Sequence, residues 1–267
     1  MKKKSQSLRI KILNEGVYNR NQLKIDYSPT YIEPPQETIE FIEKKWNAAF
    51  KKNKILFDGV LFRLDNYSST NGFLNLRLSK TTYKFFFGSR TEEFEKKFGK
   101  KFMANPLSVG TLIETSDKKL LFGRRLNNLD FDPGLFSVLA GTMDAKIDLT
   151  NNVPDPFKSL LRELYEEKSI AEKEVIESRC LGIVYNSEYK QTYLPFFTRI
   201  NITSETLLEK PCNEVEFRKF FLVNSTVKSV ENFLIPQIQD FSQTCLANII
   251  LWEKKILKTN LISTSIL

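Results

Sequence analysis

The stretch that decides the fold is Arg162–Glu163–Leu164–Tyr165–Glu166–Glu167–Lys168–Ser169–Ile170. It lies in a segment with clear signals for a helix start, because Asp155 suits the N-cap and Pro156 suits the first helical position. On such a helix three carboxylates are spaced by three and four residues and project from one face, namely Glu163, Glu166 and Glu167.

A solvated acidic face is the simplest interpretation of this cluster, but it fits poorly. Like charges one turn apart repel by about 0.2–0.5 kcal/mol, and carboxylates near a helix C-terminus oppose the helix dipole. Four residues beyond the three glutamates stand Glu167, Ile170 and Ala171, so no cation is placed there to pair with them. A hard divalent cation with oxygen ligands, Mg²⁺ or Mn²⁺, explains why the cluster is kept. The stretch therefore predicts a metal site.

The same stretch resembles the second half of the Nudix box, G-x5-E-x7-R-E-U-x-E-E-x-G-U, in which U is an aliphatic residue. Arg162–Ile170 matches it except at Ser169, where the box has glycine. Gly141 is similar to the opening glycine of the box, but it stands 21 positions before Arg162 instead of 14. The resemblance therefore implies an insertion of seven residues in the loop before the helix.

Three box positions depart from the pattern. Ala140 replaces the first of the paired glycines. The first box glutamate falls on Ile147 when counted from Gly141 and on Pro154 when counted back from the helix. Ser169 replaces the helix-ending glycine, and a left-handed serine there costs about 1 kcal/mol. None of these changes removes the three central glutamates, so we expect an active enzyme.

Composition places the chain among ordinary globular proteins. Its 267 residues are 41% hydrophobic and 27% charged, which suffices for one large domain or two modest ones. Histidine is absent, and this excludes Ser–His and Cys–His nucleophile pairs and zinc sites that need imidazole. The net charge of +8 suits a phosphate-bearing ligand and would suit RNA as well.

The cysteines and the N-terminus bear on location. Cys180, Cys212 and Cys245 are widely spaced and odd in number, which indicates a reducing compartment rather than a disulfide framework. The basic start is not followed by the apolar core of a signal peptide. No apolar run reaches the roughly 18 residues of a membrane span. We expect a cytoplasmic protein without a membrane partner.

Residues 1–104 are expected to form an α+β extension. Leu8–Ile12 has strand periodicity, and a helix follows Pro34–Pro35 with Trp46 as a core anchor. From residue 55 to 87 the signals favour strands, and the run Phe85–Phe87 is expected to be extended and buried on both sides. Asn71–Gly72 predicts a turn, with a connection too long for a tight hairpin. We expect the extension to pack firmly on the remaining chain and to help form a wall of the substrate site.

Residues 105–267 are expected to form the catalytic domain, beginning at Asn105–Pro106. The segment Ala145–Pro154 is polar and predicts an exposed loop. A long helix is expected from Pro236 to about Leu257, packed on the domain. Strands are expected over Leu107–Thr115, Lys119–Arg124, Leu135–Ala140, Cys180–Tyr185, Thr192–Arg199 and Phe217–Val223.

Four further segments resemble the eukaryotic UDP-sugar Nudix hydrolases: Leu56–Arg63, Ala104–Gly110, Glu114–Asp117 and Asn248–Trp252. This resemblance implies a fold of mixed α+β and α/β character, the Nudix αβα sandwich with an N-terminal α+β extension. It also implies Mg²⁺-dependent cleavage of a nucleoside diphosphate sugar, with UDP-glucose giving UMP and glucose 1-phosphate.

The resemblance assigns roles to individual residues. Glu163, Glu166 and Glu167 take the metal-binding and water-activating positions, and Arg162 takes that of the arginine that orients them. Asp144 stands where many members have a loop carboxylate, and either Glu214 or Glu216 supplies a later one. Gly141 contributes to substrate binding. Two arginines at a strand end are candidates to bind the phosphates, Arg124 and Arg125.

Three alternatives stay open. The chain could be a decayed Nudix domain that binds a nucleotide, or a Nudix hydrolase for another nucleoside diphosphate derivative. A basic RNA-binding or decapping protein is the third, but the sequence lacks a concentrated Lys/Arg patch beside aromatic residues. We therefore expect a small-molecule substrate rather than a nucleic-acid partner.

Overall fold

The structure, a computed structural model, describes residues 8–52, 56–213 and 215–262. An eight-stranded mixed sheet forms its centre, with β1, β11, β12, β5, β6 and β13 in that spatial order. Two short strands extend it, β7 beside β6 and β8 beside β5. The bounds are β1 Ile10–Tyr18, β5 Leu107–Glu114, β6 Lys119–Arg125, β7 Phe136–Ser137, β8 Leu139–Thr142, β11 Val175–Asn186, β12 Gln191–Ile200 and β13 Phe217–Asn224.

Helices cover both faces of this sheet. On one face lies α4, Pro156–Lys168, whose Phe157 ring meets the edge of Phe196 from β12 at 5.1 Å between centroids. On the other lies α7, Gln243–Trp252, in the same apolar cluster as Phe197. Neighbouring residues of one strand point to opposite faces, so the two phenylalanines belong to two separate cores. The domain is the expected αβα sandwich.

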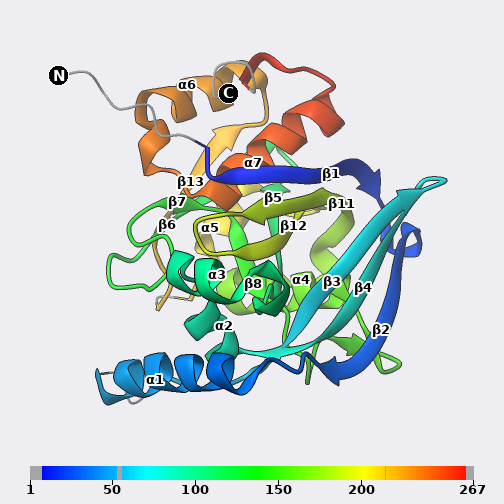
Figure 1. Ribbon diagram of the computed structural model, residues 1–267. Coiled ribbons are helices and arrows are strands. Elements are labelled where there is room, and N and C mark those ends of the chain that lie inside the picture. Colours follow the sequence, from blue (N-terminus) through cyan, green and yellow to red (C-terminus); the bar gives the residue numbers. More distant parts are fainter. Residues whose placement is uncertain (1–7, 53–55, 214, 263–267) are drawn as a thin grey trace.

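The N-terminal region contributes to more than one layer (Figure 1). Strand β1 pairs antiparallel with β11 at the edge of the central sheet. A separate three-stranded sheet has the order β2, β4, β3. Its strands are β2 Leu23–Tyr31, β3 Val60–Thr70 and β4 Phe73–Thr82, and the helices of the region are α1 Gln36–Lys52, α2 Tyr83–Ser89 and α3 Glu92–Phe98. The division of the chain at residue 104 stays a prediction.

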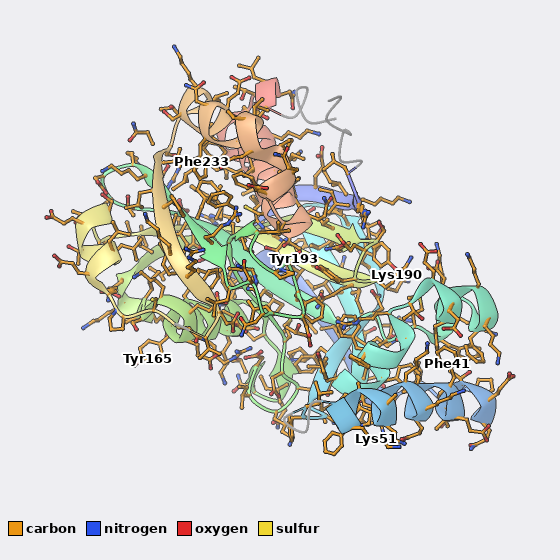
Figure 2. All side chains as sticks on the ribbon, turned by 90° about the vertical axis from the view of Figure 1, so that its left-hand side faces the viewer. Phe41, Lys51, Tyr165, Lys190, Tyr193 and Phe233 are labelled. Atoms are coloured by element: carbon orange, nitrogen blue, oxygen red, sulfur yellow. The ribbon has the colours of Figure 1, made fainter. Side chains whose placement is uncertain are left out.

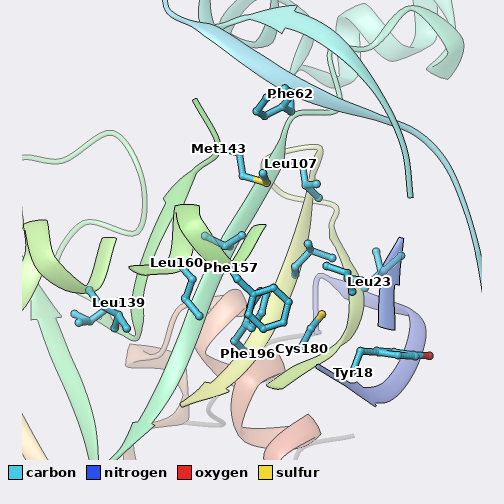
Figure 3. Packing of buried hydrophobic residues seen from close by; sticks show 14 of the residues in the cluster. Tyr18, Leu23, Phe62, Leu107, Leu139, Met143, Phe157, Leu160, Cys180 and Phe196 are labelled. Atoms are coloured by element: carbon cyan, nitrogen blue, oxygen red, sulfur yellow. The ribbon is translucent and has the colours of Figure 1, made fainter. Parts of the chain in front are cut away.

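Apolar packing joins the N-terminal region to the central sheet and α4. The backbone N–H of Phe62 on β3 donates to the carbonyl of Met143 at 3.4 Å. Figure 3 shows Phe62 above Met143 and Leu107, and all three belong to one buried cluster with Leu160 of α4. The predicted core anchor Trp46 is also buried, against Phe87.

The sequence expectation for Phe85–Phe87 was wrong. These residues form part of α2 rather than a strand, and the Thr82 side chain caps that helix by accepting from the N–H of Phe85. The helical turn directs Phe86 toward Phe131, where the two rings stack at 6.1 Å. Three consecutive aromatic residues have no period of their own, so tertiary packing decides between helix and strand.

The turn at Asn71–Gly72 also differs from expectation, because β3 and β4 form a tight hairpin. Thr70 pairs with Phe73, so only two residues connect the strands. Both have positive φ, 51° for Asn71 and 77° for Gly72, as a two-residue hairpin of the I′ type requires.

The prediction for the segment Ala145–Pro154 also needs correction. The inserted segment after Gly141 is not simply an exposed loop, because it forms a small hairpin of β9 (Leu149–Thr150) and β10 (Val153–Pro154) and fully buries Asp148.

The C-terminal helix is shorter than predicted. Ser242 caps α7, and the preceding turn, Ile235–Asp240, has a non-helical residue at Gln237. A π-helical turn, Glu253–Leu257, follows α7. The remaining helices are α5 Ser204–Glu209 and α6 Val227–Leu234. Among the helices in the described ranges, none combines the length and apolarity needed to cross a bilayer.

Candidate active site

Helix α4 begins where the sequence predicted. The Asp155 side chain accepts from the N–H groups of Phe157 and Lys158, and Pro156 occupies the first turn. Thr150 of β9 donates its hydroxyl to the same carboxylate at 2.8 Å, and Arg20 forms an ion pair with it. These contacts fix the N-terminus of α4. They therefore fix the position of its glutamates along the helix relative to the sheet.

The helix also ends where the sequence predicted. Ser169 adopts a left-handed conformation with φ of 53°, and its N–H donates back to the last turn. The following N–H, that of Ile170, donates to the carbonyl of Leu164 at 3.1 Å. The serine therefore performs the C-cap role that glycine has in the box, at a conformational cost.

Arg162 connects the inserted hairpin to the glutamates. Its Nε and Nη2 donate to the two carboxylate oxygens of Asp148 at 2.9 and 2.8 Å. Its Nη1 lies 2.7 Å from Glu163 Oε1 and 2.9 Å from Glu166 Oε2. The guanidinium thus orients two of the three glutamates, and Asp148 orients the guanidinium.

Sequence reasoning missed Asp148 and selected Asp144 instead. The Asp144 carboxylate accepts from the N–H of Lys146 at 2.7 Å, within its own turn, while the N–H of Asp144 donates to Asp148 at 2.8 Å. Asp148 sits in the insertion, where the box offers no position for it. The one available signal was an acidic residue 14 positions before the arginine. A metal-binding role for Asp144 stays a prediction.

Gly141 lies directly against Glu163. A Cβ atom at position 141 would lie 1.9 Å from Glu163 Oε1, so only glycine allows β8 to approach the helix this closely. Burial raises the pKa of Glu163 to about 7, and Glu166 adds to the rise while Arg162 opposes it. This carboxylate is therefore held beside the strand in a poorly solvated position.

Glu167 is the most deeply buried of the three glutamates. Its Oε2 accepts from the backbone N–H of Ala140 at 2.9 Å, so the alanine still supplies a backbone donor. Its Oε1 is buried, without a hydrogen-bond partner among the described residues. Burial raises its pKa well above the ordinary value, and the carboxylates of Glu163 and Glu216 raise it further. An orphan buried carboxylate oxygen is rare and costly in folded proteins.

The structure also places Glu216, one of the two candidates for the later carboxylate, and both candidate arginines. Glu216 raises the pKa of both Glu163 and Glu167, which places it near them, and it pairs with Arg125 at 3.3 Å. Glu214 lies outside the described residues. Arg125 lines a cavity beside Gly141, whereas Arg124 pairs with Asp240 at 3.6 Å and lies over the Phe136 ring.

A cavity of about 140 Å³ opens beside Gly141. Its outer wall contains Asp132, whose Oδ1 accepts from the Tyr189 hydroxyl at 3.1 Å, and Phe131, whose ring meets Tyr189 at 4.8 Å. Phe131 stacks in turn on Phe86 of α2. The N-terminal region therefore supports one wall of the cavity.

Comparison with known proteins gives relatives of moderate similarity. No family model matches the chain. Nudix hydrolase 9 of Arabidopsis thaliana is 28% identical over 200 residues, covering 61% of this chain and 64% of that protein. The human uridine diphosphate glucose pyrophosphatase NUDT22 is 26% identical over 219 residues, covering 71% and 72%. The chain is therefore similar in sequence to a Nudix hydrolase and to UDP-glucose pyrophosphatases.

Solved structures are similar to part of the chain. An Ap4A hydrolase of C. elegans, solved as a binary complex, has a TM-score of 0.37 and 13% identity, covering 55% of this chain and 92% of that one. A bifunctional NMN adenylyltransferase/ADP ribose pyrophosphatase of Francisella tularensis, with AMP and a manganese ion, has a TM-score of 0.42 and 11% identity, covering 56% and 41%.

The site on α4 fits a divalent cation by its donor chemistry. Carboxylate oxygens are the ligands that Mg²⁺ and Mn²⁺ prefer, and the orphan Oε1 of Glu167 would gain a partner. Within the described part of the chain, no three His, Cys, Asp or Glu side chains converge as a complete metal site. Instead, Glu163 and Glu166 share Nη1 of Arg162.

Proposed function

We propose that the protein is a Nudix diphosphatase that depends on a divalent cation, Mg²⁺ or Mn²⁺, and cleaves a nucleoside diphosphate sugar. UDP-glucose is the proposed substrate, and UMP and glucose 1-phosphate are the proposed products. The observation that carries the proposal is the buried Oε1 of Glu167, without a partner among the described residues and close to Glu163 and Glu216. The mammalian relatives named for UDP-glucose support the choice of sugar nucleotide.

The residues divide into holding and orienting groups. Glu163, Glu166 and Glu167 would hold the cation, which when bound would neutralise the diphosphate and acidify an attacking water. One of these glutamates would take the proton of that water. Arg162 and Asp148 keep the carboxylates oriented. Arg125, at the cavity, would contact the phosphates.

Glu167→Gln tests the proposal. The substitution keeps the shape of the side chain and removes the charge that a cation needs, so Mg²⁺-dependent formation of UMP should fall by about 10²–10⁴-fold. Folding should be kept, because a buried charge with a raised pKa is removed. The exposed Glu172→Gln is the matched control and should leave turnover unchanged.

The assay should include other substrates and a chelator. UDP-glucose is compared with other nucleoside diphosphate sugars, dinucleoside polyphosphates, CoA and capped RNA, with and without EDTA. Normal hydrolysis by Glu167→Gln would show that the helix does not carry the chemistry. Faster hydrolysis of another compound would change the assigned substrate, while the proposed role of α4 would stand.

A second candidate function is a nucleotide-binding module without catalysis. Two observations favour it: the first box glutamate is absent at both Ile147 and Pro154, and the described carboxylates do not form a complete metal site. Such a protein would gain thermal stability with UDP-glucose, by mass action on the folded state, without releasing product.

A further inference from the structure

A second and larger cavity lies away from the glutamates. It measures about 440 Å³ and lies between β1, β3 and the ends of β11 and β12. We call it the basic cleft, because five cationic side chains line it: Lys11, Arg63, Lys100, Lys101 and Lys190. Its volume is in the range of small-molecule sites, roughly 300–1,000 Å³.

The basic cleft and the cavity beside Gly141 lie on opposite faces of the same two strand ends. On β11, Tyr185 lines the basic cleft and Asn186 lines the other cavity. On β12, Thr192 lines the basic cleft and Gln191 lines the other cavity. Because alternate residues of a strand face opposite sides, a ligand in the basic cleft would not occupy the candidate active site.

Part of the positive charge in the cleft is fixed in place. Lys190 has only 13% of its side chain exposed and lies 2.7 Å from Glu95, and Lys100 lies 3.5 Å from the same carboxylate. The contact with Lys190 holds the pKa of Glu95 below its ordinary value. A single ionised carboxylate therefore positions two ammonium groups toward the cleft.

The other cationic side chains differ in whether a carboxylate pairs with them. Arg63 pairs with Asp65 and donates to the carbonyls of Lys101 and Met103. Lys11 and Lys101 are exposed, and neither forms an ion pair with a described residue; the Lys101 ammonium lies over the Phe102 ring, 4.6 Å from its centroid. Five cations against the carboxylates of Asp65 and Glu95 leave three positive charges uncompensated. Mutual repulsion of these charges is relieved by a bound anion.

Two tyrosines complete the lining. Lys11 pairs directly with Tyr185 across β1 and β11, and Tyr67 of β3 is fixed by donating its hydroxyl to the carbonyl of Leu13 at 3.4 Å. Aromatic faces beside lysines are the surroundings in which nucleotide bases stack while phosphates pair with cations. The residues come from distant segments, which is why no such patch is visible in the sequence.

We propose that the basic cleft is a second ligand site, which binds a small anion carrying a di- or triphosphate group. Lys11, Lys100, Lys101 and Lys190 contact the phosphates, and Tyr67 and Tyr185 face any base attached to them. The volume of about 440 Å³ favours a small molecule over a long polymer, which needs an extended groove.

The test measures binding of inorganic triphosphate to the full chain by calorimetry, with EDTA present. Wild type should bind one equivalent saturably, and the Lys11→Glu/Lys101→Glu variant should bind at least tenfold more weakly. Lys44→Glu/Lys51→Glu makes the same change in net charge on the exposed surface of α1, and it should bind like wild type. Figure 2 labels Lys51 and Lys190, which lie well apart.

Further arms separate the ligand sources and the two cavities. ATP and UTP binding more tightly than triphosphate would show that the tyrosines contact a base; equal affinities would assign the site to the phosphates alone. Arg125→Gln should not change binding, since Arg125 lines the other cavity. If the glutamate pair fails to fold, Lys11→Gln/Lys101→Gln replaces it.

Several results would overturn the proposal. One is the absence of saturable binding, and another is equal weakening in the α1 control. Loss of binding in Arg125→Gln would assign the anion to the candidate active site. Binding of single-stranded RNA through Lys11 and Lys101 without binding of triphosphate would make the cleft a nucleic-acid surface. UDP-glucose hydrolysis is measured separately, so failure here leaves the proposed activity untouched.

Discussion

Asp132, at the wall of the cavity, has an unfavourable backbone conformation and a buried carboxyl group. Its backbone has a positive φ of 47°, and burial raises the pKa of its carboxyl to about 6 from 3.8. The Tyr189 hydroxyl and Arg125 oppose this rise without cancelling it. A carboxylate that is costly to ionise at the wall of a cavity is a candidate for ligand contact rather than for stability.

Asp132→Asn should therefore stabilise the protein at neutral pH. A raised folded-state pKa contributes stability that is present below about pH 4 and is lost as the pH rises through about 6. Asparagine tolerates the left-handed backbone equally well and never ionises, so the variant should gain about 1–3 kcal/mol at pH 7.5 and much less at pH 4. Urea unfolding at both pH values measures the difference. An equal gain at both would contradict the assigned pKa.

Gly141 offers a second residue-scale prediction, which concerns geometry rather than charge. In Gly141→Ala the new methyl group would collide with the Glu163 carboxylate, which must then move away from β8. Hydrolysis should fall by about 10²-fold or more, as for other displacements of about 1 Å in a catalytic group.

Gly59→Ala is the matched control for Gly141→Ala. A Cβ at position 59 meets only the Phe57 ring, at 3.5 Å, so activity should be unchanged. Both variants are checked for folding by thermal unfolding. Full activity of Gly141→Ala would mean that Glu163 need not stay beside β8.

At the scale of elements, α4 could be predicted and α2 could not. The start and stop of α4 depend on local chemistry, the Asp155 cap and the residue at position 169, and both are visible in the sequence. The run Phe85–Phe87 becomes helical because Phe86 and Phe87 meet Phe131 and Trp46, which lie far away in sequence. Asp148 was missed for a similar reason, since its partner lies on another element.

Ser169→Gly should stabilise α4. The serine pays the steric cost of a left-handed backbone, which glycine avoids, so the free energy of unfolding should rise by about 1 kcal/mol. Ser169→Ala retains a Cβ and should give no such gain. Urea unfolding of the three proteins measures the effect. Equal stability of the glycine and alanine variants would show that the cap is not strained.

At the scale of the whole molecule, the order of the central sheet could not be predicted. Local periodicity identified most of its strands, but it gave no reason to place β1 beside β11, more than 150 residues away. The same holds for the basic cleft, whose lysines lie on β1, after α3 and between β11 and β12. Only the folded chain brings these segments together.

The N-terminal region is therefore expected to be needed for folding. Strand β1 covers the edge of β11, and Phe62, Leu74 and Leu76 share one buried cluster with residues of β5 and α4. Removing them would expose the unpaired edge of a strand and a large apolar surface, both of which promote aggregation. Phe86 would no longer support Phe131 at the cavity.

Deleting residues 1–104 should accordingly give insoluble protein, or soluble protein with greatly weakened substrate affinity. A shorter deletion, residues 1–18, removes β1 and keeps the three-stranded sheet, so it should retain part of the stability and most of the cavity wall. Soluble yield, thermal unfolding and the KM for UDP-glucose distinguish the two deletions. A soluble, fully active fragment beginning at Asn105 would show that the catalytic domain is complete without the preceding region, and that β1 and the cluster around Phe62 are dispensable for its folding.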